Sequence, residues 1–416
     1  MNNKKILAVI IVLALVFRIV FALIVPIFEK PDEKAHFEYI QFVAENKKLP
    51  VQTENDIHAE FFQPPFYHYF ASFIFSFIRT FTQNIWHQIV LLRFISIFFS
   101  MLTLCLIYKI SSLLFDDKTL RLGILAFASF LPSNINFNSA VTNSNFADFL
   151  MTLIIYLLVT FIMKGIDYKK IFLLGIIVGI SLITRLSVIP LTAVIPFVLF
   201  IKHYPNVKKI IKPLIIIFSI ALIISGWYFL RNFNLYGDFL GINAMKLASP
   251  PDDIKVDSIF VARLLGWTFI TFWASFGRTN GIFIGNFTSI SGMIIFIVSY
   301  LLLLLVTFAA FYGLYKFLRK YRNNKNILND TQKKAFIVII FYLALLGLSF
   351  ISFNFYNFQP QGRLFFPAIS TIAIFFTFGM YNLFNRIKRN EFLLVYMAFF
   401  IILDVVSVIS ISHYYL

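Results

Sequence analysis

The chain has 416 residues, of which 60% are hydrophobic, 19% are aromatic and only 13% are charged. This composition excludes a soluble globular domain, which has no way to cover so much apolar surface. The formal charge of +17 comes mainly from Lys and Arg in short loops between apolar runs, so it indicates membrane topology rather than nucleic-acid binding. Several runs are long enough, as helices, to cross a hydrocarbon core of about 30 Å, and lipid favours helices over open sheets. The predicted fold class is an all-α polytopic membrane protein.

The first apolar run, residues 6–26, follows a basic amino terminus and is predicted to leave the cytoplasm as a retained span. Residues 28–88 then form a long extracytoplasmic segment, whose aromatic stretch PPFYHYFASFIFSFIRTF is expected to lie as a helix at the membrane interface. Counting this stretch as a span would instead place the later basic loops outside, against the positive-inside rule.

The later runs, among them residues 90–114, 121–141 and 211–230, bring the prediction to about eleven spans. A second long extracytoplasmic segment, residues 231–284, is expected to hold another interfacial helix. Every dense Lys/Arg cluster is then cytoplasmic, and residues 1–416 form one multi-pass domain in the plasma membrane.

Unusual polar stretches gather at the outer ends of these predicted spans. They are PDEKAHF, QPPFYHY, TNSNFAD, ITRLS, RNFNLYGD and QPQGR. Ionisable groups at membrane depth are costly and usually functional, so their concentration on one side predicts an outward-facing site.

The first of these stretches contains Asp32, Glu33 and His36. Pro31 suits the first turn of a helix, which would place Asp32 and His36 on one face with Glu33 one step around. One interpretation is acidic capping of an interfacial helix, because carboxylates are stabilised at a helix start. The other is a general base at the water–lipid boundary, where an ionised Asp32 accepts a proton from an incoming hydroxyl.

A metal site is a further interpretation of the same segment, which offers oxygen and nitrogen ligands. They are Asp32, Glu33, His36, His58 and His68. The Asp-Glu-x-x-His pattern lacks the second His of the zinc motif, so zinc is not predicted. The oxygen-rich set leaves room for a loosely held Mg²⁺ or Mn²⁺.

Arg185, Arg231 and Arg363 each lie at the outer end of an apolar run. Snorkelling to lipid headgroups would account for any single one of them. Three from separate spans indicate a phosphate site, since Arg binds phosphate through a bidentate and permanently charged fork. In QPQGR, Gly362 allows a sharp turn that would aim Arg363, and Gln361 adds an amide contact.

Other polar side chains on the same side are candidates for binding the substrate. They are Gln63, His68, Asn143, Asn145, Asp148, Tyr236 and Gln361. An aromatic belt at the membrane interface is the simpler interpretation of the tyrosines beside His68. Asp238, in the turn after Tyr236, is either a second acid or a capping residue, and capping is the favoured interpretation.

Together, PDEKAHF, the QPP helix start, TNSNFAD, WYFLRNFNLYGD and QPQGRLFFPA resemble the GT-C glycosyltransferases. That superfamily includes protein O-mannosyltransferases and the aminoarabinose transferases of lipid A, and the chain is most similar to a bacterial branch with P-D-E-x-x-H and Q-G-R motifs. The resemblance implies eleven or more transmembrane helices and a sugar donor on polyprenyl phosphate. It also implies a catalytic base in the first outer loop, here Asp32 or Glu33. Asn145 stands where relatives often carry Asp.

The predicted activity is inverting transfer of a sugar from a polyprenyl-phosphate donor to a hydroxyl of a glycan, lipid or protein acceptor. Asp32, helped by Glu33 or His36, would act as the base. The alternative is a transporter or flippase of a lipid-linked glycan, which needs a polar path to the cytoplasmic side; only Arg18 and Asp404 stand out there. A third interpretation is a non-catalytic assembly subunit, which would leave the outer polar residues without a role.

Overall fold

The computed structural model describes residues 3–56, 59–250, 254–277, 282–285 and 289–415. Within these ranges the regular elements are all helices. Two isolated β-bridges occur there, and no β-strand is formed in the described ranges. The helices are α1 (Asn3–Ile24), α2 (Glu33–Asn46), α3 (Phe66–Arg79), α4 (Ile85–Leu114), α5 (Lys118–Ser129), α6 (Pro132–Asn138), α7 (Ser144–Lys164), α8 (Tyr168–Leu182), η1 (Leu186–Val188), α9 (Ile189–Thr192), α10 (Val194–His203), α11 (Lys208–Tyr236), α12 (Ile242–Ala248), α13 (Ser258–Trp273), α14 (Ile290–Asn323), η2 (Lys325–Ile327), α15 (Asp330–Asn354), η3 (Gly362–Ala368), α16 (Ile369–Leu383) and α17 (Arg389–Tyr415).

Nine helical segments in the described ranges are long and apolar enough to cross a membrane. They are α1, α4, α7, Leu186–His203, α11, α14, α15, Gly362–Leu383 and α17. Two further predicted spans correspond to α8, which has 15 residues, and to the pair α5 and α6. The break between α5 and α6 falls just before Pro132, which has no N–H to continue a helix but suits the first turn of the next one. The prediction of an all-α polytopic membrane protein is confirmed.

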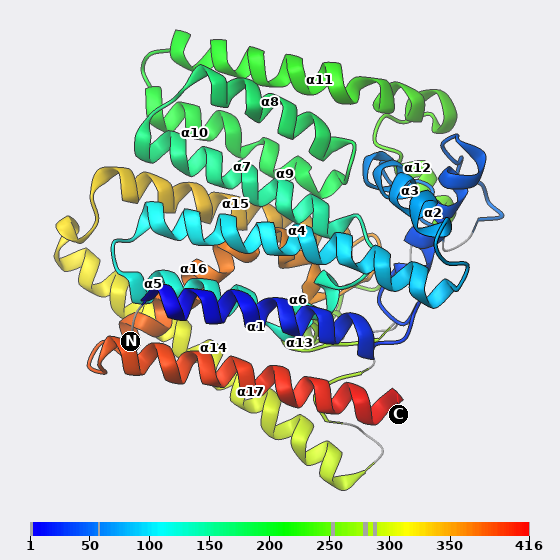
Figure 1. Ribbon diagram of the computed structural model, residues 1–416. Helices are drawn as coiled ribbons and strands as arrows, with labels where there is room; N and C mark the ends of the chain where they lie inside the picture. Colours follow the sequence, from blue (N-terminus) through cyan, green and yellow to red (C-terminus); the bar gives the residue numbers. More distant parts are fainter. Residues whose placement is uncertain (1–2, 57–58, 251–253, 278–281, 286–288, 416) are drawn as a thin grey trace.

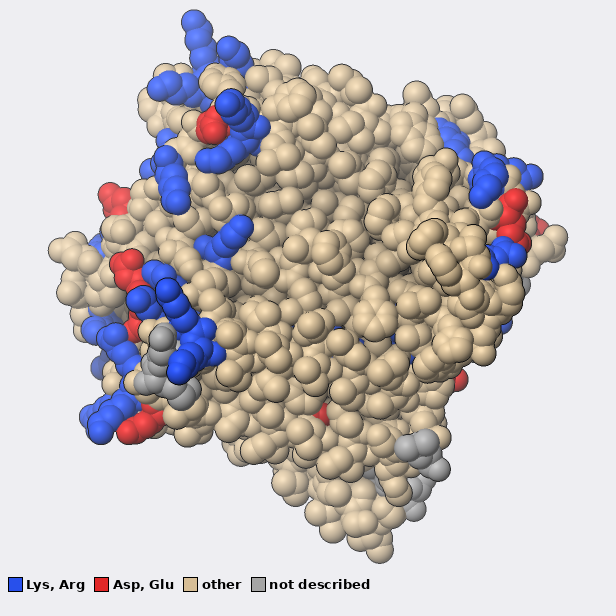
Figure 2. Space-filling model, viewed as in Figure 1, with Lys and Arg blue, Asp and Glu red and all other residues tan. Residues whose placement is uncertain are grey.

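The long helices lie side by side, with the amino terminus at one end of the bundle and the carboxyl terminus at the other (Figure 1). The short helices α2, α3 and α12 gather at the end that holds the carboxyl terminus (Figure 1). Most Lys and Arg side chains gather at the opposite end, and a wide band with almost no charge separates the two ends (Figure 2). The bundle is therefore polarised in charge along its length.

Glycines allow the closest helix contacts in the bundle. A Cβ added to Gly313 of α14 would overlap the carbonyl oxygen of Gly379 in α16, and one on Gly379 would overlap the carbonyl of Ala310. Small residues let helix backbones approach closely in lipid, where the hydrophobic effect does not drive helices together. This contact brings α14 and α16 together on one side of the large cavity described below.

The aromatic stretch after QPP forms α3, as predicted. Tyr67 and Phe75 are buried on the face toward the protein, whereas Phe73, Phe77 and Phe81 are exposed. An amphipathic helix with an aromatic face suits an interfacial position, which stays a prediction for α3.

Candidate functional site

The turn before α2 separates two neighbouring carboxylates. Helix α2 begins at Glu33, and Asp32 precedes it in a left-handed conformation, with φ of 59°. The expectation that Pro31 starts the helix and that Asp32 belongs to its first turn is wrong, because this conformation lies outside the helix. Asp32 also makes no side-chain capping bond to α2. As a result, the Asp32 and Glu33 side chains have different partners.

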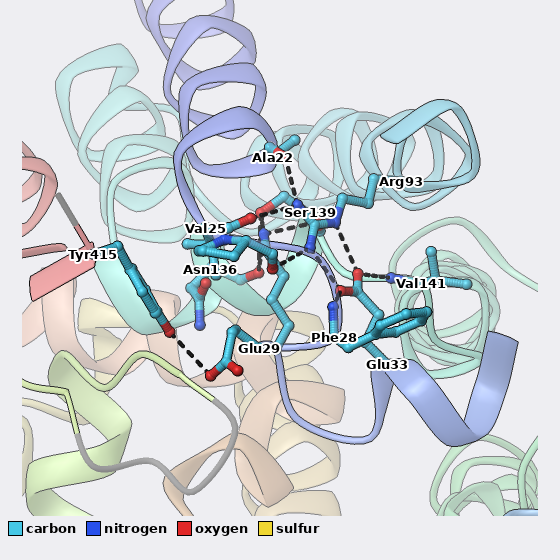
Figure 3. A network of polar contacts seen from close by, with 12 residues as sticks. Ala22, Val25, Phe28, Glu29, Glu33, Arg93, Asn136, Ser139, Val141 and Tyr415 are labelled. Carbon is cyan, nitrogen blue, oxygen red and sulfur yellow. Dashed lines mark hydrogen bonds and ion pairs between the residues drawn. The ribbon is translucent and has the colours of Figure 1, made fainter. Parts of the chain in front are cut away.

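Glu33 is fully buried and is paired with Arg93 of α4 (Figure 3). Arg93 Nε donates to Glu33 Oε1 at 2.8 Å, and its second guanidinium nitrogen donates to Oε2 at 2.6 Å. The backbone N–H groups of Val141 and Phe28 donate to the same two oxygens, each at 3.0 Å. Each oxygen of Glu33 thus already accepts two hydrogen bonds, which indicates an anchoring role.

The same network joins the first outer turn to the ends of other helices. Arg93 also donates to three carbonyl oxygens at the end of α1 and just beyond it, those of Ala22, Val25 and Pro26. Lys30 is buried, and its Nζ donates to the carbonyl and hydroxyl oxygens of Ser139 at 2.8 and 2.5 Å. The turn that carries Asp32 is therefore held on both sides by buried, charge-assisted hydrogen bonds.

Asp32 contacts Arg363, a residue far away in the sequence. An Asp32 Oδ2 to Arg363 guanidinium distance of 2.8 Å defines the ion pair, whose side chains are 42% and 12% exposed. Burial favours the neutral acid, but Arg363 and, more weakly, Arg185 outweigh it and hold the pKa of Asp32 below its ordinary value. Two predicted groups, the first-loop acid and the QGR arginine, thus lie together.

Arg363 is itself held in place by its surroundings. Its Nε donates to Gln361 Oε1 at 2.5 Å, and its guanidinium lies 5.2 Å from the centre of the Phe137 ring. The preceding residue, Gly362, donates its N–H to Thr271 Oγ1 of α13 at 2.7 Å. The side chain and the backbone at this position are both fixed.

Gly362 is needed for a reason different from the one expected. The sequence suggests a sharp turn, but Gly362 is not among the described residues with positive φ. Instead, a Cβ at this position would overlap the backbone of Phe272. The glycine lets η3 approach α13 closely, and this approach places Arg363 opposite Asp32.

Arg185 lies in the same group of charges. Its guanidinium donates to the hydroxyl of Ser144, at the start of α7. It also interacts electrostatically with Asp148, Arg363 and Asp32. The structure therefore brings together two of the three predicted phosphate-binding arginines.

The third, Arg231, has a different partner. It donates to the carbonyl oxygen of Pro50 at 2.5 Å, while the Tyr236 hydroxyl accepts from the backbone N–H of Gln52 at 2.9 Å. The end of α11 thus holds the segment at 50–52, and the described contacts include none from Arg231 to Asp32 or Arg363. Asp238 accepts from the backbone N–H of Ile242 and of the next residue, each at 2.9 Å, so its interpretation as a capping residue is confirmed.

His36 and His68 form a buried pair beside Asp32. His36 Nδ1 and His68 Nε2 are 2.9 Å apart, and the His68 ring stacks on Tyr39 with a centroid distance of 3.9 Å. Burial lowers the pKa of His36 to about 4 and that of His68 well below its usual value. Both rings are neutral at pH 7, so one donates and the other accepts in their hydrogen bond.

Glu60 is a site residue that the sequence analysis missed. Its Oε2 accepts from Gln63 Nε2 at 2.8 Å, and Gln63 Oε1 in turn accepts from Asn143 Nδ2 at 3.3 Å. Burial, with a contribution from the nearby charge of Asp32, raises the pKa of Glu60 to about 7. Its position three residues before Gln63 in the first outer segment was the available signal.

The predicted residues of α7 are buried beside this cluster. Asn145 donates through Nδ2 to the Phe137 carbonyl at 3.1 Å, which links it to the residue that stacks on Arg363. Asp148 is buried, and its Oδ1 has no hydrogen-bond partner among the described atoms. Such an orphaned buried oxygen is available to a ligand hydroxyl.

A large apolar cavity adjoins the site. It has a volume of about 680 Å³ and lies between α13, α14, α15, η3 and α16. Phe272, which touches Gly362, and Phe365, two residues after Arg363, both line it. Other lining residues, such as Leu265, Phe311 and Ile340, are exposed on the flank of the bundle, so the cavity is reached from the side.

No protein-family model matches the sequence, and no curated protein matches it. Three solved structures are similar over nearly the whole chain. ArnT from Cupriavidus metallidurans bound to undecaprenyl phosphate has a TM-score of 0.59 at 12% identity, covering 96% of this chain and 64% of that one. The Archaeoglobus fulgidus oligosaccharyltransferase with zinc and sulfate has a TM-score of 0.57 at 15% identity, covering 97% and 53%. Archaeoglobus fulgidus AglB with an inhibitory peptide and dolichol-phosphate has a TM-score of 0.56 at 13% identity, covering 99% and 56%.

The chain thus shares the fold of these membrane proteins, in agreement with the helical membrane fold that the sequence resemblance implied. It spans between 53% and 64% of the length of these three structures.

One of the similar structures holds zinc. In the described ranges of this chain, no group of three His, Cys, Asp or Glu side chains is placed to hold a metal ion. Glu33 is paired with Arg93, and Asp32 is paired with the guanidinium of Arg363. His58, a predicted ligand, lies outside the described residues. The described donor set therefore does not fit a metal.

Proposed function

We propose that this protein is a membrane glycosyltransferase that moves a sugar from a polyprenyl-phosphate donor to an acceptor hydroxyl. The observation that carries the proposal is the pairing of Asp32 with Arg363 next to a large apolar cavity. The pairing supports the proposal because, with these roles, a proton acceptor, a phosphate-binding group and room for an isoprenoid chain would lie at one point of the fold. Two structures with this fold were solved with polyprenyl phosphates, namely undecaprenyl phosphate in ArnT and dolichol-phosphate in AglB.

The donor would bind with its tail in the apolar cavity. An isoprenoid chain gains free energy by filling a preformed apolar groove that opens toward lipid. Phe272 and Phe365 connect this groove to the QGR turn, so the phosphate of a bound donor would lie near Arg363 and Arg185. Guanidinium groups suit this task because they stay charged and donate to two phosphate oxygens at once.

The site would face the outside of the plasma membrane, with the amino terminus in the cytoplasm. The end of the bundle that holds the amino terminus carries most of the Lys and Arg side chains (Figure 2). Short basic loops stay cytoplasmic, so the opposite end, with α2 and α3, would be extracytoplasmic.

In the proposed reaction, Asp32 accepts the proton of the acceptor hydroxyl as its oxygen attacks the anomeric carbon. The bond from that carbon to the phosphate oxygen breaks, and the polyprenyl phosphate leaves with the electron pair. Arg363 and Arg185 stabilise the charge that develops on the leaving phosphate. A single displacement inverts the anomeric centre, because no enzyme nucleophile intervenes.

Other predicted residues take supporting roles in this scheme. Glu33 anchors the turn through Arg93, and His36 packs beside the base. On the side of α7, the Asp148 Oδ1 atom, which has no hydrogen-bond partner among the described atoms, and the Asn143 amide would bind sugar hydroxyls.

Transport of a lipid-linked glycan gains no support from the polar residues on the other side of the bundle. Arg18 and Asp404, which stood out in the sequence, are both buried. Arg18 donates to Ser100 Oγ and to the carbonyls of Ala14 and Ser129. The contacts with Ser100 of α4 and Ser129 of α5 join α1 to neighbouring helices.

The test is turnover of radiolabelled polyprenyl-phosphate sugars by the purified protein in lipid nanodiscs. We expect transfer to an acceptor, or slow hydrolysis in its absence, and a loss of at least about a hundredfold in Asp32→Asn. Glu54→Gln, an exposed acid in the same outer segment, is the matched control and should keep full turnover. Normal turnover by Asp32→Asn removes Asp32 from the base role, and binding of the polyprenyl-phosphate sugar without turnover by the wild type would indicate a carrier.

A further inference from the structure

In the scheme above, Arg363 has both Asp32 and the donor phosphate as partners. Its Nε already donates to Gln361, and one of its two terminal nitrogens lies 2.8 Å from Asp32. A phosphate that binds through two parallel N–H···O bonds would need both terminal nitrogens, one of which is engaged by Asp32. A carboxylate held in this way is also a poor proton acceptor, since the pair stabilises its charged form.

The two members of the pair are not equally constrained. Arg363 is 12% exposed, bonded to Gln361 and stacked on Phe137, and its backbone follows the tightly packed Gly362. Asp32 is 42% exposed and makes no capping bond to α2. The Asp32 side chain is the member that is free to rotate.

The neighbours of Asp32 are anchored, so its side chain can rotate without a wider rearrangement of the backbone. Glu33 is fixed to Arg93, and Lys30 is fixed to Ser139, so the chain on both sides of the turn stays in place. Asp32 itself has φ of 59°, a conformation that non-glycine residues adopt rarely and that often marks a functional position. Only the side-chain dihedrals of one residue need to change.

We infer, resting on the proposed function, that Asp32 and the donor phosphate compete for Arg363, so that donor binding frees the carboxylate to accept the proton. In the absence of donor, Asp32 occupies the position of a phosphate oxygen on the guanidinium. The donor phosphate would interact with Arg185 as well as Arg363 and brings the binding energy of its tail, so it displaces Asp32. Binding is then ordered, with the lipid donor ahead of the acceptor, and the base becomes available only when a sugar is in place.

If Asp32 competes with the phosphate for Arg363, substitution of Asp32 should strengthen phosphate binding, whereas substitution of a residue that contacts the donor should weaken it. Removing the Asp32 charge abolishes transfer but leaves Arg363 without a competitor, so the lipid phosphate should bind more tightly. A residue that merely lined the donor site would weaken binding on substitution. The gain must also depend on Arg363, because any other effect of losing a negative charge would persist without it.

The experiment measures binding of undecaprenyl phosphate, which carries no sugar and so gives no turnover, to the full chain in nanodiscs. The variants are wild type, Asp32→Asn, Arg363→Gln and the double substitution, and Asp32→Ser provides a second removal of the carboxylate. We expect at least about fivefold tighter binding in both Asp32 variants, a typical size for coupled sites. When Arg363 is already replaced by Gln, adding Asp32→Asn should alter the affinity for undecaprenyl phosphate by less than about twofold.

Unchanged or weaker binding in both Asp32 variants overturns the exchange while leaving the glycosyltransferase proposal intact. A fivefold gain that persists without Arg363 overturns it as well, because the competition then lies elsewhere. Failure of every variant to bind undecaprenyl phosphate overturns the proposed function together with this inference. Thermal unfolding of each variant, with Glu54→Gln as the reference, confirms that the proteins compared are folded.

Discussion

Glu33 and Arg93 form a buried ion pair with two hydrogen bonds, of 2.8 and 2.6 Å, directly below the turn that carries Asp32. Their side chains are 0% and 1% exposed. The adjacent carboxylate of Asp32, in contrast, reaches the open side of the same turn. One carboxylate therefore holds the turn in place, and the other is 42% exposed and paired with Arg363.

Glu33→Gln should destabilise the fold, because it leaves Arg93 as a buried and uncompensated charge. Breaking a buried pair in this way costs about 3–5 kcal/mol. Chemical unfolding in detergent measures the loss, and Asp32→Asn is the control, with a much smaller expected effect. Equal stability of Glu33→Gln and wild type would contradict the anchoring role.

Glu60 should make the stability of the protein depend on pH near neutrality. Its pKa is raised to about 7, mainly by burial, from an ordinary value near 4.5. Between these two values the folded protein binds the proton more strongly than the unfolded chain, so the contribution of this group to stability falls as the pH rises and then levels off. Glu60→Gln removes this contribution and keeps an oxygen for Gln63.

The measurement is the melting temperature of wild type and Glu60→Gln at intervals from pH 5 to pH 8. The melting temperature of Glu60→Gln minus that of the wild type should increase as the pH rises from 5 to 8. A difference that stays constant with pH would show that Glu60 does not titrate there.

Gly362→Ala should displace the QGR turn, since the added Cβ would overlap the backbone of Phe272. We expect transfer to fall by about tenfold or more, because misplacing a reacting group by about 1 Å can cost a hundredfold. Gly266→Ala is the control: its Cβ would meet nothing within 4 Å. Full activity of Gly362→Ala would mean that the close approach of η3 to α13 is not required for the site.

Gly347→Phe should obstruct the apolar cavity. Gly347 lines the cavity, and a side chain at this position starts in open space, so the ring can enter without a backbone clash. The KM for the polyprenyl-phosphate donor should rise by about tenfold, with a smaller effect on kcat, because the change removes uniform binding of the tail. Gly266→Phe, at an exposed position that does not line the cavity, is the control. An unaltered donor KM in Gly347→Phe would place the tail elsewhere.

Much of the architecture was predictable, because it depends on local properties of the chain. The lengths of apolar runs set the spans, and the positions of basic loops set their expected direction. The segment predicted as a single span at 121–141 forms two short helices, α5 and α6, which are separated just before Pro132. The predicted number of spans still includes this segment once. The helix over the QPP stretch followed from its amphipathic, aromatic pattern.

The site was predictable only in part. The motifs indicated Asp32 and the three arginines Arg185, Arg231 and Arg363 as a group, and the structure brings Asp32, Arg185 and Arg363 together. Arg231 instead donates to the Pro50 carbonyl. Glu60 was missed because it is one of several acids in the first outer segment, and only its spacing to Gln63 distinguishes it. Which arginine faces the acid depends on how helix ends pack, and sequence spacing does not record that.

By itself, the sequence determined that this protein is a bundle of membrane helices with charged loops at one end and polar motifs at the other, because hydrophobicity and charge act residue by residue. Only the tertiary structure decided that Glu33 is an anchor and that Asp32 faces Arg363. Two adjacent carboxylates are equivalent in a sequence, but a single left-handed residue at the start of α2 sends them to different partners. That difference arises from contacts between distant segments, which exist only once the helices have packed.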